Sequence, residues 1–293
     1  MGSFERKSNS DEMLFQGVLS GLKLVFTTDL WIKETLPEDR NKSYKEWNMK
    51  IKDGFELIKN KLYIRCIKEE DIDRIKNSGI LYWYGQLPSK NDIIIELFLE
   101  KFDDSSEYRD PMDKTLLALR FLKEGYVSIH KIFLISYDNK SAGIDGDYEP
   151  LMVADSIYYL TPKDIPNLKD LLNHLMKIDW VKHFSYGIAC YRFGKSYDEK
   201  LSNKLIDLYI GLEALFCKKD VRNKGEKIGI SCSDLLGESD SNKEIIKNTI
   251  IEGYRIRNSV VHGNSEDVVK ILEICPILED YLRKSLILLI PKM

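Results

Sequence analysis

The sequence of 293 residues has few cysteines, and no two of them form a C-x-x-C pair. An odd, scattered set in a chain of this length is typical of reduced thiols and argues against a disulfide framework or a zinc site. Cys217 and Cys275 stand in apolar helical stretches, where we expect them to pack in the core. We expect neither a metal ion nor any other cofactor.

Long hydrophobic runs are also missing. The longest uninterrupted apolar run, Leu286 to Ile290, is far too short to cross a bilayer. Residues 1–12 are polar and mixed in charge, which is unlike a signal peptide. We therefore expect a soluble, cytoplasmic protein without a membrane partner.

The chain has no excess of positive charge, because 44 Lys and Arg stand against 47 Asp and Glu. The net charge of −3 excludes a bulk polycation that coats nucleic acid, but not a nucleic-acid enzyme with a local basic cleft. Hydrophobic residues make up 43% and aromatic residues 11%, which is too much for a disordered chain. The length suits one large domain or two modest ones.

The first half of the chain predicts a mixed α/β domain over residues 1–160. Segments rich in Ile, Tyr and Phe, mostly bounded by turn residues, predict strands at residues 61–67, 80–84, 93–102 and 129–137. A broad apolar face predicts one helix from about Asp113 to Lys123. Residues 138–150 hold two glycines, a proline and four acidic side chains, so we expect a loop there.

The second half predicts an all-α antiparallel bundle over residues 161–293, which makes the fold class α+β. The expected helices run from Pro166 to near Trp180, from His183 to Phe193, from a Ser196-x-x-Glu199 capping box through Leu215, from Glu226 to a stop at Gly237, from a Ser241-x-x-Glu244 capping box to His262, and onward to Ile290 with a kink or a division at Pro276. Gly263 is well placed to end the fifth helix in the left-handed conformation.

Two short motifs suggest ligand sites but are incomplete. Gly194-Lys195-Ser196 is similar to the end of a phosphate-binding loop, yet that pattern needs a glycine where Ala189 stands. Asp145-Gly146-Asp147 suggests calcium but lacks the remaining acidic ligands. We interpret the first motif as a turn between helices and the second as a polar loop.

The end of the fifth predicted helix combines side chains that carry chemistry. Asn258 and His262 are four residues apart and share a face, with Tyr254 one turn earlier. Arg255 is nearly eclipsed with His262, whereas Arg257 lies about 140° away on a long side chain. One edge of the helix therefore gathers two guanidinium groups, an amide and an imidazole.

Such a set suits RNA cleavage without a metal ion. An imidazole can accept or return a proton near neutral pH, and an arginine can hold the oxygens of a phosphorane as charge develops on them. An amide can orient the phosphate or the histidine. The alternative is a surface helix end, at which His262 binds a terminal carbonyl and stabilises the helix dipole.

Longer stretches around this helix support the first interpretation. Residues 197–216 (YDEKLSNKLIDLYIGLEALF) contain an E-x-L core at Glu213 to Leu215, and residues 252–264 (EGYRIRNSVVHGN) carry an R-x(4–6)-H pattern that ends in His-Gly. Together with KGEKIGISCSDLLG between them and MDKTLLALRFLKEGYVSI at residues 112–129, these stretches resemble the HEPN superfamily, specifically its Apea-like branch. The likeness covers the last third of the chain well and the N-terminal half loosely.

HEPN domains are helical bundles, often homodimeric, and their active members are metal-independent endoribonucleases of defence, toxin–antitoxin and stress systems. The resemblance implies that Arg257 and His262 are catalytic in a cleft shared by two copies, with Asn258 as the polar residue that follows the arginine. The 2′-hydroxyl would attack, leaving a cyclic phosphate and a free 5′-hydroxyl. Arg255 also fits the permitted spacing, so which arginine acts is open. Glu213 matches the branch's helix acid, for which packing or a salt bridge is the other explanation.

Contact with RNA needs local positive charge, and Arg255 is one source of it. A second is the segment of residues 218–227, which holds five basic and two acidic side chains between two predicted helices. We expect an RNA-binding role there for Lys218, Lys219, Arg222, Lys224 and Lys227, the alternative being a solvated loop. Glu213 and Tyr254 would support the site.

A different class of function is a non-catalytic HEPN module, which dimerises or binds a nucleotide or RNA while the N-terminal domain senses a ligand. Superfamily members without activity exist, so the motif permits catalysis but does not establish it. The expected partners are RNA, a second copy of the chain, and an antitoxin or regulatory protein. A metal-dependent hydrolase is disfavoured because the sequence shows no ligand cluster.

Overall fold

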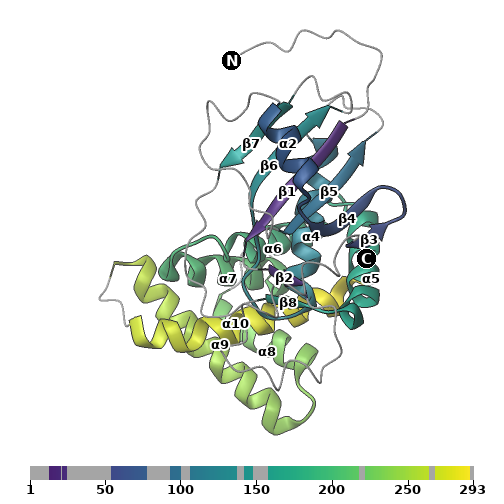
Figure 1. Ribbon diagram of the computed structural model, residues 1–293. Coiled ribbons are helices and arrows are strands. Elements are labelled where there is room, and N and C mark those ends of the chain that lie inside the picture. Colours follow the sequence, from purple (N-terminus) through teal and green to yellow (C-terminus); the bar gives the residue numbers. More distant parts are fainter. Residues whose placement is uncertain are drawn as a thin grey trace, which may run out of the picture. The chain divides into compact units, whose positions relative to one another are not determined.

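A computed structural model describes residues 13–20, 22–24, 54–77, 93–99, 106–136, 142–147, 158–217, 222–263 and 268–290 (Figure 1). The chain divides into two compact units, Met1–Leu172 and Asn173–Met293. The division falls within helix α5 (Ile165–Lys177), whereas the predicted boundary at residue 160 precedes that helix. The fold is α+β, with a sheet in the first unit and a helical bundle in the second.

The N-terminal unit contains a six-stranded antiparallel sheet, in which the described strands have the order β3-β4-β5-β1-β6-β7 (Figure 1). The strands are β1 (Met13–Ser20), β3 (Phe55–Ile58), β4 (Leu62–Cys66), β5 (Ile93–Leu99), β6 (Ser128–Ser136) and β7 (Ala142–Asp147). Strands β4, β5 and β6 confirm three of the predicted strands, and the fourth, at 80–84, lies outside the described residues. The loop predicted at 138–150 is wrong for residues 142–147, which pair with β6 along the edge of the sheet, and the rest of that range lies outside the described residues.

Strand β1 lies inside the sheet, although the sequence analysis assigned it no structure. It pairs in unbroken register with β5 on one side and, across one register shift, with β6 on the other. A separate two-stranded parallel sheet joins β2 (Leu22–Leu24) to β8 (Tyr158–Leu160). The N-terminal segment therefore supplies strands to both sheets.

Two described helices accompany the large sheet, α2 (Glu69–Asn77) and α4 (Ser106–Leu122). The helix predicted at about residues 113–123 corresponds to α4, which begins one to two turns earlier than expected. Apolar side chains of α2 pack on the sheet in a buried cluster of Ile67, Ile72, Ile75, Ile94 and Phe133. Removal of this apolar surface from water holds α2 against β5 and β6.

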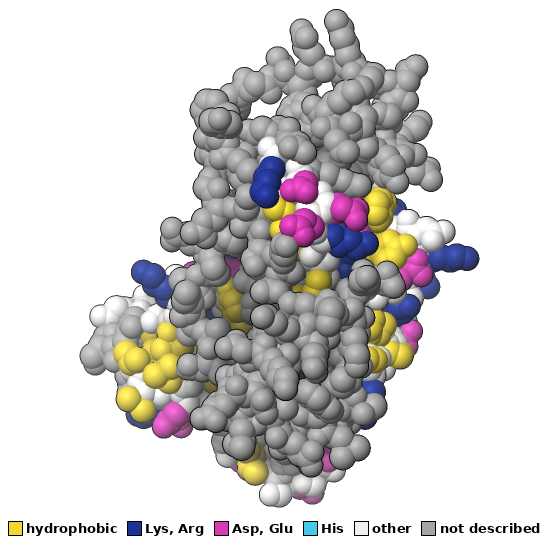
Figure 2. Space-filling view, in the orientation of Figure 1, with side chains coloured by type: hydrophobic (Ala, Val, Ile, Leu, Met, Phe, Trp, Pro, Cys, Tyr) yellow, Lys and Arg dark blue, Asp and Glu magenta, His cyan; other side chains and the backbone are white. Residues whose placement is uncertain are grey.

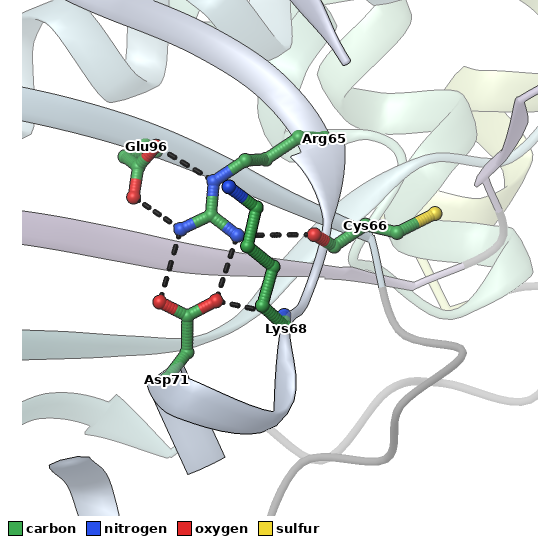
Figure 3. Close-up of polar contacts among 5 residues, drawn as sticks. All are labelled: Arg65, Cys66, Lys68, Asp71 and Glu96. Atoms are coloured by element: carbon green, nitrogen blue, oxygen red, sulfur yellow. Dashed lines mark hydrogen bonds and ion pairs between the residues drawn. The ribbon is translucent and has the colours of Figure 1, made fainter. Parts of the chain in front are cut away.

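A buried ion cluster also ties α2 to the sheet (Figure 3). Arg65 on β4 donates all five guanidinium N–H groups: Nε and Nη2 to Glu96, Nη1 and Nη2 to Asp71, and Nη1 to the carbonyl of Cys66. Asp71 also accepts the backbone N–H of Lys68 at 2.7 Å, just before α2 begins. Burial lowers the pKa of Arg65, but hydrogen bonds and the charges of both carboxylates outweigh it and raise the pKa.

The C-terminal unit is a helical bundle, as predicted. Its helices are the end of α5, α6 (Phe184–Lys195), α7 (Leu201–Phe216), α8 (Lys224–Leu236), α9 (Asp240–Val261) and α10 (Val268–Leu289). Helix α7 is central, because it contacts α6, α8, α9 and α10. Its leucines at three- and four-residue spacing, Leu205, Leu208 and Leu212, are fully buried, which is the reason the sequence pattern identified the helix.

The helix ends differ from the predictions at three places. Ser196 ends α6 and its hydroxyl donates to the Phe193 carbonyl, so it does not cap α7, which begins at Leu201. The N-cap of α9 is Ser239, whose hydroxyl accepts the N–H of Asn242, two residues before the predicted capping box. The last helix is continuous through Pro276 and is not divided there.

Further predictions about this unit concern the bounds of α8 and the state of the cysteines. Helix α8 ends before Gly237 as expected, but it begins at Lys224 and not at Glu226. All five cysteines are free; Cys275 is buried and Cys217 is half-buried. Burial raises the pKa of the Cys275 thiol to about 12. No helix within the described ranges is long and apolar enough to span a bilayer.

Candidate functional site

The C-terminal end of α9 carries the predicted catalytic residues. His262 is the C-cap, and its backbone N–H donates to the Asn258 carbonyl at 3.0 Å. Gly263 follows with φ +69°, the left-handed conformation that was predicted for it. His262 and Gly263 are both exposed, so the imidazole stands in solvent at the tip of the helix.

Arg257, one turn and a half before the tip, is held on several sides. Its Nη1 donates to Asn258 Oδ1 at 3.1 Å, and its Nη2 lies 3.8 Å from Glu213 Oε1. The guanidinium carbon is 5.7 Å from the centroid of the Tyr254 ring, a cation–π distance. Only 19% of the side chain is exposed, so the guanidinium lies half-buried between α9 and α7.

Glu213 on α7 is the carboxylate that joins three helices. Besides the contact with Arg257 on α9, its Oε2 accepts a hydrogen bond of 2.8 Å from Lys224 Nζ at the start of α8. This hydrogen bond and the charge of Glu213 raise the pKa of Lys224. The residue predicted as a supporting acid and two predicted cations therefore form one cluster, which we call the Glu213 cluster.

Tyr254 sets the spacing within the Glu213 cluster. Its ring packs edge-on against Tyr209, with centroids 5.4 Å apart, and Tyr209 Oη donates to the Ile250 carbonyl of α9 at 2.7 Å. On the other side the ring meets Gly225, where an added Cβ would come within 2.9 Å of it. Burial and the Glu213 carboxylate raise the pKa of Tyr254, although the nearby cations oppose this shift. Neither Tyr209 nor Gly225 was predicted from the sequence, because spacing along one helix gives no signal for residues on its neighbours.

The Glu213 cluster does not use all of its hydrogen-bonding groups. Glu213 Oε1 and Arg257 Nε are buried, and neither has a hydrogen-bond partner among the described residues. Leaving buried polar groups unpaired costs about 1–3 kcal/mol each, so this arrangement is not optimised for stability alone. Both groups therefore keep the capacity for one further hydrogen bond.

The predicted residues are only partly brought together. Glu213 and Arg257 contact each other, and through them Lys224, Tyr254 and Asn258 join one group. In contrast, the side chains of Arg255 and His262 are exposed, and the interactions of the described residues include no side-chain contact between either of them and that group; His262 meets it only through its backbone N–H, which donates to the Asn258 carbonyl.

The basic segment before α8 is described only in part. Lys218 and Lys219 lie outside the described residues. Arg222 and Lys227 are exposed, and Asn223, which follows Arg222, takes a left-handed conformation with φ 56° at the N-cap of α8. Within the described part, this segment therefore adds two solvent-exposed cations beside Lys224.

The described residues hold no group of three or more His, Cys, Asp or Glu side chains that could bind a metal ion.

No protein-family model matches the sequence, and comparisons with curated proteins and with solved structures give no match.

Proposed function

We propose that the protein is a metal-independent endoribonuclease of the HEPN type, in which Arg257 and His262 act in a cleft formed by two copies of the chain. One observation carries the proposal. Near the end of α9, the His262 imidazole is exposed to solvent, and the Arg257 guanidinium is held in place while its Nε has no hydrogen-bond partner among the described residues. The R-x(4–6)-H spacing and the polar Asn258 after Arg257 match the superfamily's signature.

The chemistry follows from the properties of these side chains. An imidazole accepts the proton of the 2′-hydroxyl while O2′ attacks the adjacent phosphorus. The P–O5′ bond then breaks, and a second acid gives a proton to the leaving 5′-oxygen, so that a 2′,3′-cyclic phosphate and a 5′-hydroxyl result. Arg257 stabilises the charge that develops on the non-bridging oxygens. Asn258, which binds Arg257 Nη1, sets the direction of the guanidinium.

A second copy of the chain would supply the second acid. Each chain presents one His262, whereas the reaction needs both a base and an acid, and a two-fold interface provides both from one motif. Exposed apolar side chains stand next to His262 in the chain and at the start of α10, where Figure 2 shows hydrophobic side chains gathered. They are Val261, Val268, Val269 and Leu272, each about half exposed or more. Such an apolar group beside the tip suits the interface that the proposal requires.

The test is cleavage of single-stranded RNA by the full chain in the presence of EDTA. We expect His262→Ala to lower kcat by about 10²–10⁴-fold, the usual contribution of an acid–base group. We expect Arg257→Ala to lower kcat by about 10²–10³-fold, as for the loss of one oxyanion donor. His174→Ala, an exposed histidine on α5, is the matched control and should leave kcat unchanged.

Arg255→Ala decides between the two arginines. If Arg257 acts on the phosphorane, Arg255→Ala weakens RNA binding at low salt and leaves kcat intact. If Arg255 acts instead, Arg255→Ala lowers kcat, and Arg257→Ala weakens RNA binding and leaves kcat intact. Cleavage that survives both His262→Ala and Arg257→Ala would refute the catalytic assignment.

One observation favours the alternative, a non-catalytic HEPN module with a ligand-sensing N-terminal unit. Arg257 already faces Glu213, and this ion pair explains its position without any substrate. In that case the full chain would bind RNA or a nucleotide without cleaving RNA. Roles in antiviral defence, in a toxin–antitoxin pair or in stress, and regulation by an antitoxin, belong to either form of the proposal.

A further inference from the structure

Helix α6 exposes a row of large apolar and aromatic side chains. Phe184 is 68% exposed and Tyr191 is 64% exposed, and Val181 in the preceding turn is 89% exposed. The opposite side of the same helix buries Tyr186, Ala189, Cys190 and Phe193 in the bundle. Helix α6 is therefore apolar on both faces. Packing in the C-terminal unit explains the apolar residues of the buried face but not those of the exposed face.

The two exposed rings share one face of α6. They are seven residues apart, which places them within about 20° of each other and roughly 10 Å apart along the helix axis. Half-buried Ile188 lies between them on the same face, and Lys195 continues the row one turn beyond Tyr191. We call Phe184, Ile188, Tyr191 and Lys195 the α6 row.

The chain before the α6 row is fixed in place. Trp180 stacks on Tyr186 with ring centroids 6.2 Å apart and lies over Gly187, where an added Cβ would be 3.3 Å from the indole. Asp179 Oδ1 accepts the backbone N–H groups of Val181 and Lys182 at 3.0 and 3.1 Å. The turn that leads to Phe184 is therefore ordered before any ligand binds, which lowers the entropy cost of binding.

Cations flank the α6 row at both ends. On the N-terminal side, Lys177 ends α5 and Lys182 precedes Phe184 by two residues; the side chains of both are exposed, and neither ammonium group has a hydrogen-bond or ion-pair partner among the described residues. At the C-terminal end, the guanidinium of Arg192 lies 5.8 Å from the Tyr191 ring while it pairs with Asp207. Aromatic rings with cations beside them are the features that bind bases and phosphates of a single strand.

We propose that the α6 row binds single-stranded RNA, with Phe184 and Tyr191 each stacking on one base and the flanking cations contacting phosphates. This inference rests on the proposed function, for which it names a surface that binds the single-stranded substrate. The bases of a duplex have no free faces, so the row selects single strands. Phe and Tyr are also frequent at protein interfaces, but exposed lysines such as Lys177 and Lys182 are depleted there and attract phosphates, which favours RNA as the occupant.

The test measures binding apart from cleavage. The probe is a fluorescein-labelled, fully 2′-O-methylated single-stranded RNA of about 12 nucleotides, which lacks the attacking hydroxyl and fits the usual site size. Its Kd for the full chain is measured by anisotropy at low salt. We expect Phe184→Leu and Tyr191→Leu each to raise Kd by about 5- to 150-fold, because leucine keeps the apolar volume and removes the face on which a base stacks.

Matched variants and a second readout make the result decisive. Phe184→Trp and Tyr191→Phe keep a ring and should bind as the wild type does, as should Ile245→Ala, which removes an exposed apolar side chain of α9. Equal affinity for the leucine variants and the wild type would overturn the inference, as would a wild type that binds duplex as well as single strands. Self-association that is unchanged in the leucine variants and lost in Phe184→Ala and Tyr191→Ala would instead identify the row as a protein contact. Loss of binding in the leucine variants, combined with no RNA cleavage by the wild type, would keep this inference and reject the nuclease.

Discussion

Replacing Arg65 with methionine should severely destabilise the N-terminal unit. The guanidinium is 7% exposed, and it is the shared partner of Asp71 and Glu96, whose side chains are 3% and 8% exposed (Figure 3). Removing one partner of a buried ion pair costs about 3–5 kcal/mol, and here two carboxylates lose the same cation. We therefore expect Arg65→Met to lower the free energy of unfolding by about 3–5 kcal/mol or more at pH 7, as measured by urea unfolding followed by far-UV circular dichroism.

Two controls separate charge from hydrogen-bond geometry. Arg65→Lys keeps the charge but has three donors in place of five, so we expect an intermediate loss. In Arg65→Met, protonation of the two carboxyls that have lost this cation reduces the buried negative charge, so the deficit relative to the wild type should shrink as the pH falls toward about 4. A deficit below about 1 kcal/mol at pH 7, or one that grows on acidification, would refute the reasoning.

Two further predictions concern the packing of α8 and the pH dependence of an ion pair. Gly225→Ala should lower the free energy of unfolding by about 1–2 kcal/mol, because its Cβ meets the Tyr254 ring at 2.9 Å and this overpacking exceeds the gain in helix propensity. Gly263→Ala is the control in urea unfolding, because its added Cβ would meet no atom within 4 Å. It should lower the free energy of unfolding only through the strain of a left-handed alanine, by about 1 kcal/mol. Burial raises the pKa of Asp164, but hydrogen bonds, the one from Lys123 foremost, outweigh it and lower the pKa. A carboxyl with a lowered pKa stabilises the fold at neutral pH and loses this effect as the pH falls through its folded pKa, so Lys123→Ala should lower Tm at pH 7 and lower it progressively less as the pH falls below about 4.

The helices of the C-terminal unit could be predicted because their signals are local. Leu205, Leu208 and Leu212 mark the buried face of α7 within eight residues of sequence, and Gly263 ends α9 through its own backbone conformation. The capping boxes predicted at Ser196 and Ser241 were wrong, because a serine hydroxyl can bind free backbone groups at either end of a helix. A serine near a helix end satisfies whichever backbone group is free, and Ser196 binds the Phe193 carbonyl at the end of the preceding helix.

The sheet was harder to predict because its signals are distant. Ala142–Asp147 is rich in glycine and aspartate and has little strand preference, yet it pairs with β6 because the edge of the sheet offers free backbone groups. Strand β1 depends on residues 93–99 and 128–136, which lie far along the chain. No window of sequence around β1 contains those partners.

Spacing alone could not rank the arginines, and their surroundings now separate three of them. Arg65 uses all five N–H groups on buried partners, so no donor is left for a ligand. Arg257 has one partner at hydrogen-bond distance, a carboxylate at 3.8 Å and an Nε without a hydrogen-bond partner among the described residues, so it retains donor capacity for a ligand. Arg255 is exposed, and no side-chain contact among the described residues holds it in one direction. Because transition-state stabilisation requires a charge that is both oriented and available, the three environments favour Arg257 as the catalytic arginine of the proposed nuclease.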